Sequence, residues 1–423
     1  SCYIKMEINT QQIDEGKGFD PKALSWGEEL KFPSSRTLSE YGNRVYNRYP
    51  ARSIFIVPRT ILSFYKDKRL NILDPFMGSG TTAVETVISG NNPYGVEINP
   101  LAIMVSEVSS TIYSAKEFAE IQKVYENVSH NWNTFKQGKL PNLKGIERWF
   151  HEEDLIKLLQ LKNAIDTLVP KKYYKFFLTV YADCIKPVSL MERQSLKPYI
   201  SKRYGKITKS VNDSFVHSFE SQCKALFSMS TLSEKAQPIT WLGHDATNFK
   251  VEPESIDIAI TSPPYINAYD YTRCTKVENS MCGFIDNDGA SKLRKLQVGH
   301  ESRRNQDINE SVYRHFSKYF DLISVVDPNR AKTCLGYFND MRKNLKCVYK
   351  ALKDNGEYYM IIGDNSIRKI EVPTHEIIAN IANDLGFKWI GYFKYEIKDQ
   401  RTSIPRNNKP KKMRFEHVLI FRK

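Results

Sequence analysis

Short apolar runs alternate with helix-compatible segments near the start and towards the end of the chain. The apolar runs that are typical of buried strands are residues 70–73, 94–97, 239–242, 256–260, 357–362, 389–393 and 417–421. Helix-compatible segments are residues 83–89, 337–352 and 374–385. The order strand, loop, helix, strand predicts an α/β fold built on a parallel sheet.

Two long segments interrupt this alternation. Between residues 102 and 237, apolar residues such as Leu155, Leu158 and Leu159 recur at helical spacing, which predicts a mainly helical insertion. A second insertion, at about residues 268–335, is charged and without clear periodicity, so we expect it to be irregular. The predicted domains are an N-terminal arm at residues 1–30, a catalytic domain at residues 31–101 and 238–423, and the helical insertion at 102–237.

Composition narrows the class of protein. At 423 residues the chain can bury a sizeable core, and no apolar stretch is long enough to span a bilayer, so we expect a soluble cytoplasmic protein. The 7 cysteines form no C-x-x-C pair, so neither a disulfide framework nor a metal site is indicated. A net charge of +14 favours a polyanionic partner such as nucleic acid.

A glycine loop follows the first predicted strand, at residues 74–82. Glycine has no Cβ, so backbone N–H groups and a helix N-terminus can approach a ligand closely there. Glu97 ends the next strand, where a carboxylate can receive ribose hydroxyls, and Asp245 follows the third. The loop lacks the third glycine of dinucleotide sites and the Gly-Lys-Ser/Thr of phosphate loops.

A second loop, Thr-Ser-Pro-Pro-Tyr at residues 261–265, follows another apolar run. Consecutive prolines fix φ and stiffen the backbone. Ser262 Oγ and the Pro263 carbonyl can therefore accept hydrogen bonds from an amine, while Tyr265 stacks on a planar ring. This combination predicts a rigid polar clamp for a planar substrate.

Together, the loops at residues 74–82 and 261–265 resemble those of the S-adenosylmethionine-dependent DNA amino-methyltransferases of restriction–modification systems. The resemblance implies a Rossmann-like sheet, S-adenosyl-L-methionine as cofactor and a base flipped out of the duplex. By this resemblance the cofactor-binding residues are Tyr41, Asn43, Asp74, Pro75, Phe76, Gly78, Gly80, Thr81, Thr82, Glu97, Asp245 and Thr261. The catalytic residues are Ser262, Pro263, Pro264 and Tyr265.

The resemblance also bears on the methylated atom. In this family, Ser before Pro-Pro-Tyr accompanies mostly N4-cytosine and Asp or Asn mostly N6-adenine, so we expect methylation of the cytosine N4 amine. N6-adenine remains an alternative. So does C5-cytosine, with Cys274 as nucleophile and Arg273 as a thiolate stabiliser. An RNA or protein amide methyltransferase and a DNA-binding protein with a decayed core are the more distant alternatives.

We expect double-stranded DNA as partner, in a bacterial or archaeal cytoplasm next to the nucleoid. The helical insertion is the candidate recognition domain, and the second insertion and residues 401–412 are further candidates for reading bases. A cognate restriction endonuclease is left open, and no membrane or metal partner is expected. Basic residues interspersed with Tyr can contact phosphates and bases. The candidate DNA-binding residues are Arg193, Lys197, Tyr199, Lys202, Arg203, Arg273, Arg303, Arg304, Arg401 and Arg406.

Overall fold

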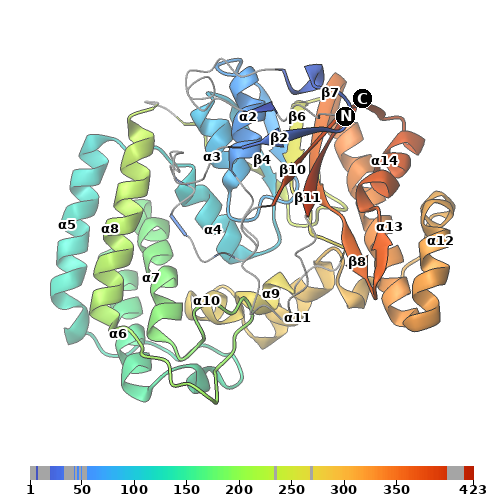
Figure 1. Ribbon diagram of the computed structural model, residues 1–423. Helices are drawn as coiled ribbons and strands as arrows, with labels where there is room; N and C mark the ends of the chain where they lie inside the picture. The colour runs from blue at the N-terminus through green and yellow to red at the C-terminus, as the bar shows by residue number, and fades with distance from the viewer. Residues whose placement is uncertain are drawn as a thin grey trace.

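A computed structural model describes residues 6–7, 20–32, 42, 45–46, 49, 55–232, 236–266, 270–397 and 414–423. Among these residues, nine strands form one sheet in the order β1-β2-β10-β11-β7-β6-β3-β4-β5 (Figure 1). Their bounds are Met6–Glu7, Glu28–Lys31, Asn71–Asp74, Asn92–Val96, Thr240–Gly243, Ile256–Thr261, Leu352–Gly363, Lys388–Glu396 and Phe415–Arg422 for β1 to β7, β10 and β11. The hairpin β8 (Asn365–Ile367) and β9 (Ile370–Val372) lies outside this sheet.

The sheet is parallel except at one strand. β11 pairs antiparallel with both β7 and β10, whereas β3 pairs parallel with β4 and β6. Parallel strands need crossover connections, which the helices supply. The strands predicted from the apolar runs are confirmed to within a few residues, and the predicted α/β class with a mainly parallel, Rossmann-like sheet is confirmed.

Both faces of the sheet are covered by packed side chains and helices, as the side chains that alternate between the two faces along β7 show. Tyr358, Met360 and Ile362 point into a core shared with α13 (Pro328–Ala351) and α14 (Thr374–Asp384). Tyr359 and Ile361 point into a second core that contains α2 (Ile56–Phe64). Because successive side chains of a strand face opposite sides, a strand buried on both faces is apolar nearly throughout.

A helical unit is inserted between β4 and β5 and lies at the left of Figure 1. Its α-helices are α4 (Pro100–Ser109), α5 (Ala115–Asn131), α6 (Glu152–Leu168), α7 (Tyr174–Val188) and α8 (Val211–Ser230). Aromatic packing joins them, with the Tyr125 and Phe219 rings stacked at 3.8 Å. The expected helical character of residues 102–237 therefore agrees with the structure, while the status of this unit as a separate domain stays a prediction.

The second insertion is helical, so the expectation of an irregular segment is wrong. It contains α9 (Tyr271–Cys274), α10 (Lys276–Met281), α11 (Asn287–Leu296) and α12 (Glu310–Val326). In α12 only Val312, Phe316 and Ile323 are buried, and this narrow stripe is hard to see among charged neighbours. The side chains of the N-cap residues Asp286 and Asn309 accept hydrogen bonds from backbone N–H groups in the first turns of α11 and α12.

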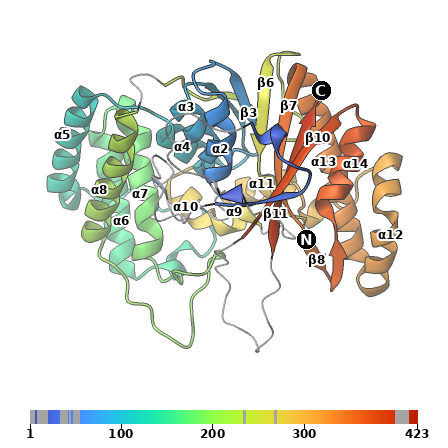
Figure 2. The same cartoon turned by 45° about the horizontal axis from the view of Figure 1, so that its top comes forward.

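The remaining elements are short. Helix α3 (Thr81–Ile88) follows the glycine loop. The 3₁₀ turns are η1 (Pro21–Ala23), η4 (Trp132–Thr134), η5 (Ile146–Trp149), η6 (Lys171–Tyr173) and η7 (Glu301–Arg303). Figure 2 shows the helices α5 to α8 and the helices α12 to α14 on opposite sides of the sheet, with α9 to α11 between them. None of the helices in the described ranges has the length and apolar character needed to cross a bilayer.

Candidate functional site

The glycine loop joins β3 to α3 in a conformation that requires glycine. Gly78 has φ +59° and Gly80 has φ +93°, both in the left-handed region. A Cβ on Gly80 would lie 2.7 Å from the Cα of Ser106, so α3 and α4 can approach closely only at a glycine. The Ser106 hydroxyl also donates to the Gly78 carbonyl at 2.8 Å, which holds the loop against α4.

Asp74 connects the two loops that the sequence singles out. It is buried at the end of β3, and its Oδ1 accepts from the Phe76 N–H at 2.9 Å and from Thr261 Oγ1 at 2.6 Å. Burial raises the pKa of Asp74 to about 6, against the lowering effect of these hydrogen bonds. The carboxylate therefore fixes the glycine loop to the start of the Pro-Pro loop.

Glu97 follows β4 and reaches back to the glycine loop. Its Oε2 accepts from the Gly78 N–H at 3.3 Å, and its backbone carbonyl lies 2.9 Å from His244 Nδ1. Burial raises the pKa of Glu97 to about 7, and the nearby Asp74 charge raises it further against three backbone hydrogen bonds. A carboxylate at this point can accept hydrogen bonds from the hydroxyl groups of a ligand bound beside the glycine loop.

The Pro-Pro loop is held by hydroxyl groups from other elements. The Tyr337 hydroxyl on α13 donates to the Pro264 carbonyl at 2.7 Å. The Tyr265 hydroxyl donates to Glu416 Oε1 on β11 at 2.5 Å, and the Tyr395 hydroxyl donates to the other Glu416 oxygen. The Tyr265 ring also packs against Gly363, where a Cβ would come within 2.7 Å of it. The position of Tyr265 is thus set by several side chains.

Both loops line one cavity of about 200 Å³. The predicted residues that line it are Pro75, Phe76, Gly78, Thr81, Glu97, Ser262, Pro263, Pro264 and Tyr265. The other predicted cofactor-binding residues that the structure describes do not line the cavity themselves: Asp74, Gly80, Thr82, Asp245 and Thr261. Asp245, for example, accepts from the Thr247 N–H at 2.9 Å, while its neighbours His244 and Ala246 line the cavity. The individual roles of these residues stay predictions.

Several lining residues were missed by the sequence reasoning. Asn99 caps α4 through the Leu101 N–H, and its amide lies 3.4 Å from the Tyr49 hydroxyl, which also borders the cavity. Tyr395 and Glu416 come from the last two strands. The one available signal was the acidic Glu416 at the start of an otherwise apolar strand.

Four predicted site residues lie outside the described residues: Tyr41, Asn43, Arg401 and Arg406.

The predicted DNA-binding residues fall into different environments. Arg193, Lys197, Tyr199, Lys202 and Arg203 are exposed on the segment between α7 and α8, and Arg273 is exposed on α9. Arg304 is half-buried. Arg303 instead makes a two-armed ion pair with the buried Asp340, at 2.7 and 2.8 Å, which occupies its guanidinium. Its assigned DNA contact is therefore poorly supported.

Cys274 has little thiolate character. Its side chain is buried in α9, and burial raises the pKa of the thiol to about 11, assisted by the Asp270 charge. Only a thiolate attacks a pyrimidine ring. Cys274 is also not among the residues that line the cavity, although its neighbours Tyr271 and Thr272 are.

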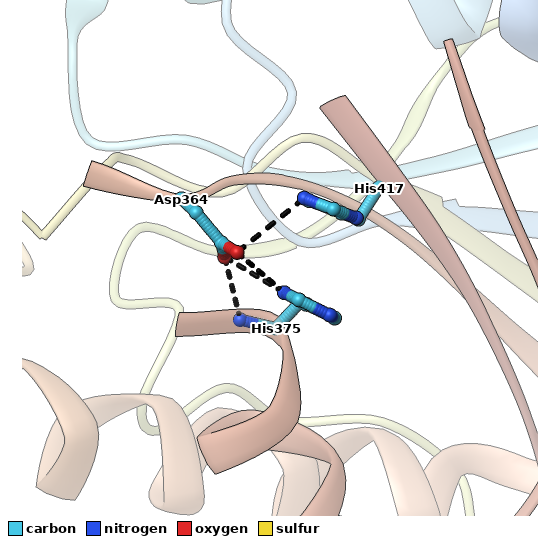
Figure 3. A group of neighbouring side chains, drawn as sticks. All are labelled: Asp364, His375 and His417. Atoms are coloured by element: carbon cyan, nitrogen blue, oxygen red, sulfur yellow. Dashed lines mark hydrogen bonds and ion pairs between the residues drawn. The ribbon is translucent and has the colours of Figure 1, made fainter. Parts of the chain in front are cut away.

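A separate polar cluster lies near the carboxyl end of β7, where Asp364, His375 and His417 meet (Figure 3). His375 Nδ1 lies 2.8 Å from both Asp364 oxygens, and Asp364 also accepts the His375 N–H at the start of α14. The two imidazole rings are stacked at 3.9 Å with planes 6° apart. Because a metal ion lies in the plane of each imidazole ligand, rings in this parallel arrangement cannot both bind one ion without rotating.

Hydrogen bonding accounts for the arrangement of that cluster. His417 Nδ1 lies 2.5 Å from the Tyr392 hydroxyl, and its Nε2 lies 3.4 Å from Asp364. Burial lowers the pKa of His417 to about 4, and the neighbouring His375 lowers it as well. An uncharged His417 thus joins β11 to β7 and α14.

Proteins with sequences similar to this chain are named as Type II methyltransferases. The chain is 24% identical over 397 residues to Type II methyltransferase M.MvaI of Kocuria varians, covering 86% of each protein. It is 21% identical over 399 residues to Type II methyltransferase M.AvaI of a Nostoc strain, covering 85% of this chain and 81% of that one. These relatives confirm the predicted kinship with restriction–modification methyltransferases. No protein-family model matches the chain.

Among solved structures, a SAM-dependent methyltransferase from Methanosarcina mazei aligns with 84% of this chain and 92% of its own. That alignment has a TM-score of 0.31 and 11% identity.

Substituting Glu97 should change how stability depends on pH. The folded pKa of about 7 lies above the ordinary 4.5, so the folded state holds this proton more tightly. Its contribution is present below about pH 4.5 and lost as pH rises through about 7, a change of about 3 kcal/mol in the free energy of unfolding. Asp74, whose pKa is raised to about 6, loses stability over an overlapping range in both proteins. Denaturant titrations should therefore show a larger loss in the wild type than in Glu97→Gln, by about 3 kcal/mol. The exposed Glu153→Gln serves as control, and parallel pH profiles for wild type and Glu97→Gln would contradict the assignment.

Proposed function

We propose that the protein is a DNA methyltransferase that transfers the methyl group of S-adenosylmethionine to the N4 amine of a flipped cytosine in duplex DNA. The observation that carries this proposal is the buried Thr261–Asp74 hydrogen bond, which places the glycine loop and the Ser-Pro-Pro-Tyr loop against one cavity. The Type II methyltransferases that align along most of the chain support the activity. The net charge of +14 supports a polyanionic substrate.

The residues of the first loop fit S-adenosylmethionine. Gly78 leaves the backbone N–H groups accessible at the start of α3, and Glu97 offers a carboxylate to the ribose hydroxyls. By family resemblance, Phe76 would line the methionine part of a bound cofactor. The cofactor supplies an electrophilic methyl group on a positively charged sulfur.

The second loop prepares the amine. The nitrogen lone pair of an exocyclic amine is delocalised into the ring, so attack requires it to be drawn out of that conjugation. Ser262 Oγ and the Pro263 carbonyl accept hydrogen bonds from the two N–H groups of the amine. These bonds orient the nitrogen lone pair towards the methyl group. The bound cofactor would supply its methyl group to the amine held by Ser262 and Pro263. The cofactor sulfur would keep the electron pair of the broken C–S bond, and the methylated amine would release one proton to solvent water.

Glu416 is a positioning residue in this arrangement. Each of its carboxylate oxygens accepts a tyrosine hydroxyl, one from Tyr265 and one from Tyr395. Tyr265 is thereby held with its ring towards the cavity, where it can stack on the flipped base. Stacking and edge contacts offset the cost of unstacking the base, which is a few kcal/mol.

Cytosine N4 is favoured over the alternatives for two reasons. A serine before Pro-Pro-Tyr accompanies mostly N4-cytosine methylation in the family that the chain resembles. A C5 mechanism needs a thiolate, whereas the buried Cys274 keeps its proton at neutral pH. Adenine N6 uses the same amine chemistry and is the main alternative. A cognate endonuclease and a place near the nucleoid also remain proposals.

The methylated atom can be identified directly. Expression in a host without DNA methylation, followed by mass spectrometry of nucleosides from its DNA, should reveal N4-methylcytosine. The host carrying Ser262→Ala is the control. N6-methyladenine would retain the mechanism and change the base, whereas modified RNA or protein with unmodified DNA would contradict the proposal.

Replacement of the clamp hydroxyl tests the chemistry. Ser262→Ala should lower turnover by on the order of 10²-fold, because it removes an acceptor that matters most in the transition state. Cofactor affinity, measured by calorimetry without DNA, should be retained. Labelled methyl transfer to unmethylated genomic DNA gives the rate, with the exposed Ser291→Ala as control. An unchanged rate for Ser262→Ala would refute its role.

Substitution of Cys274, unlike that of Ser262, should leave the methylation rate nearly unchanged. Cys274→Ser should keep turnover within about threefold of wild type, because amine methylation needs no thiolate nucleophile. The same labelled-methyl assay measures this, with thermal melting to check the fold. A folded Cys274→Ser protein without activity would favour C5 methylation instead.

A further inference from the structure

Helix α9 lies where the cavity meets both insertions. Its residues Tyr271 and Thr272 line the cavity, as do Leu296 and Gln297 at the end of α11. Figure 1 shows α9, α10 and α11 beside one another, next to the lower ends of the helical unit. A ligand longer than the cavity would therefore extend over this region.

Cations from both insertions meet around one aromatic ring. The Arg148 guanidinium lies 4.7 Å from the centre of the Trp149 ring, and Lys276 Nζ lies 5.5 Å from the same ring. Arg148 comes from the helical unit and Lys276 from α10. Trp149 is buried, so its ring is a fixed platform for both cations. Lys276 follows shortly after α9, whose residues Tyr271 and Thr272 line the cavity.

Two further arginines complete the group, which we call the rim cluster: Arg148, Arg273, Lys276 and Arg294. Burial, together with the charges of the three arginines, lowers the pKa of Lys276. Asp270 opposes this effect, but it already pairs with Arg294 at 3.1 Å and caps α9. Arg148, Arg273 and Arg294 are all exposed.

An excess of positive charge at one place is unfavourable by itself. Cations that repel one another raise the energy of the folded protein unless an anion binds between them. A nucleic acid backbone supplies anions at regular spacing, and phosphate contacts hold a duplex in register. A base that flips into the cavity brings its flanking phosphates to the cavity rim.

We propose that the rim cluster binds the DNA phosphates that flank the flipped base, and so holds the strand while its base occupies the cavity. The inference rests on the proposed function, since it takes DNA as the substrate. It assigns a DNA-positioning role to Arg148, Lys276 and Arg294 besides Arg273. It also explains why the two insertions meet beside the cavity: each contributes charge to one binding surface.

The test is a charge-removing variant with a matched control. The triple variant Arg148→Gln, Arg273→Gln, Lys276→Gln removes three positive charges but keeps side-chain stems against Trp149. The control, Lys66→Gln, Lys350→Gln, Lys388→Gln, removes three exposed charges that lie at or shortly before the first residues of β3, β7 and β10, at the strand ends opposite the cavity. Fluorescence anisotropy with unmethylated duplex DNA at several salt concentrations gives affinity and salt dependence for full-length proteins.

The rim variant should bind DNA on the order of 10²-fold more weakly. The slope of log K against log salt should fall by about 2 to 3, roughly 0.9 for each phosphate that the protein no longer neutralises. The control should stay within a few-fold of wild type. Cofactor affinity in the absence of DNA, which checks the fold, should match wild type in both.

Each other outcome has a definite meaning. Equally weakened binding in the rim variant and the control, or a wild-type slope in the rim variant, would overturn the rim cluster as the phosphate site. Wild-type protein that binds DNA but methylates none would refute the proposed function while leaving the rim test decisive. Wild-type protein that binds no DNA would overturn both.

Discussion

The hydrogen bond from Thr261 Oγ1 to Asp74 Oδ1, 2.6 Å long and buried, joins the ends of two neighbouring parallel strands. β3 carries the glycine loop and β6 carries the Pro-Pro loop, so this bond holds the two loops next to each other at one cavity. The methyl transfer proposed above depends on such positioning together with hydrogen-bond acceptors for the amine. The hydrogen bonds of Asp74 favour its carboxylate form, but burial outweighs them and raises the pKa of this group.

Charge is divided between the interior of the site and its rim. Asp74 and Glu97 lie inside, where burial raises the pKa of both carboxyl groups, while cations gather outside around Trp149. An acidic interior suits a cofactor with a positive sulfur, and a basic rim suits a phosphate backbone. Of the two cations beside Trp149, Arg148 comes from the first insertion and Lys276 from the second.

Much of the site was predictable because its chemistry is local. Residues 74–82 and 261–265 each combine turn-forming and polar residues within a few positions, and each follows an apolar run. The parallel sheet followed from the same runs. The second insertion was misjudged, because α12 buries only a narrow stripe that includes Val312 and Phe316 among charged residues. The ion pair of Arg303 could not be predicted, since its partner Asp340 lies far along the chain.

The sequence by itself determined the two loops and the α/β class, because strand alternation, glycine conformations and proline rigidity act over a few neighbouring residues. Only the tertiary structure decided that Glu416 on the last strand holds Tyr265, and that Arg148 and Lys276 share the Trp149 ring. Those contacts join residues distant in the chain, and packing of whole elements brings them together. No local pattern encodes such an approach, since a lone glutamate or lysine is compatible with any exposed position.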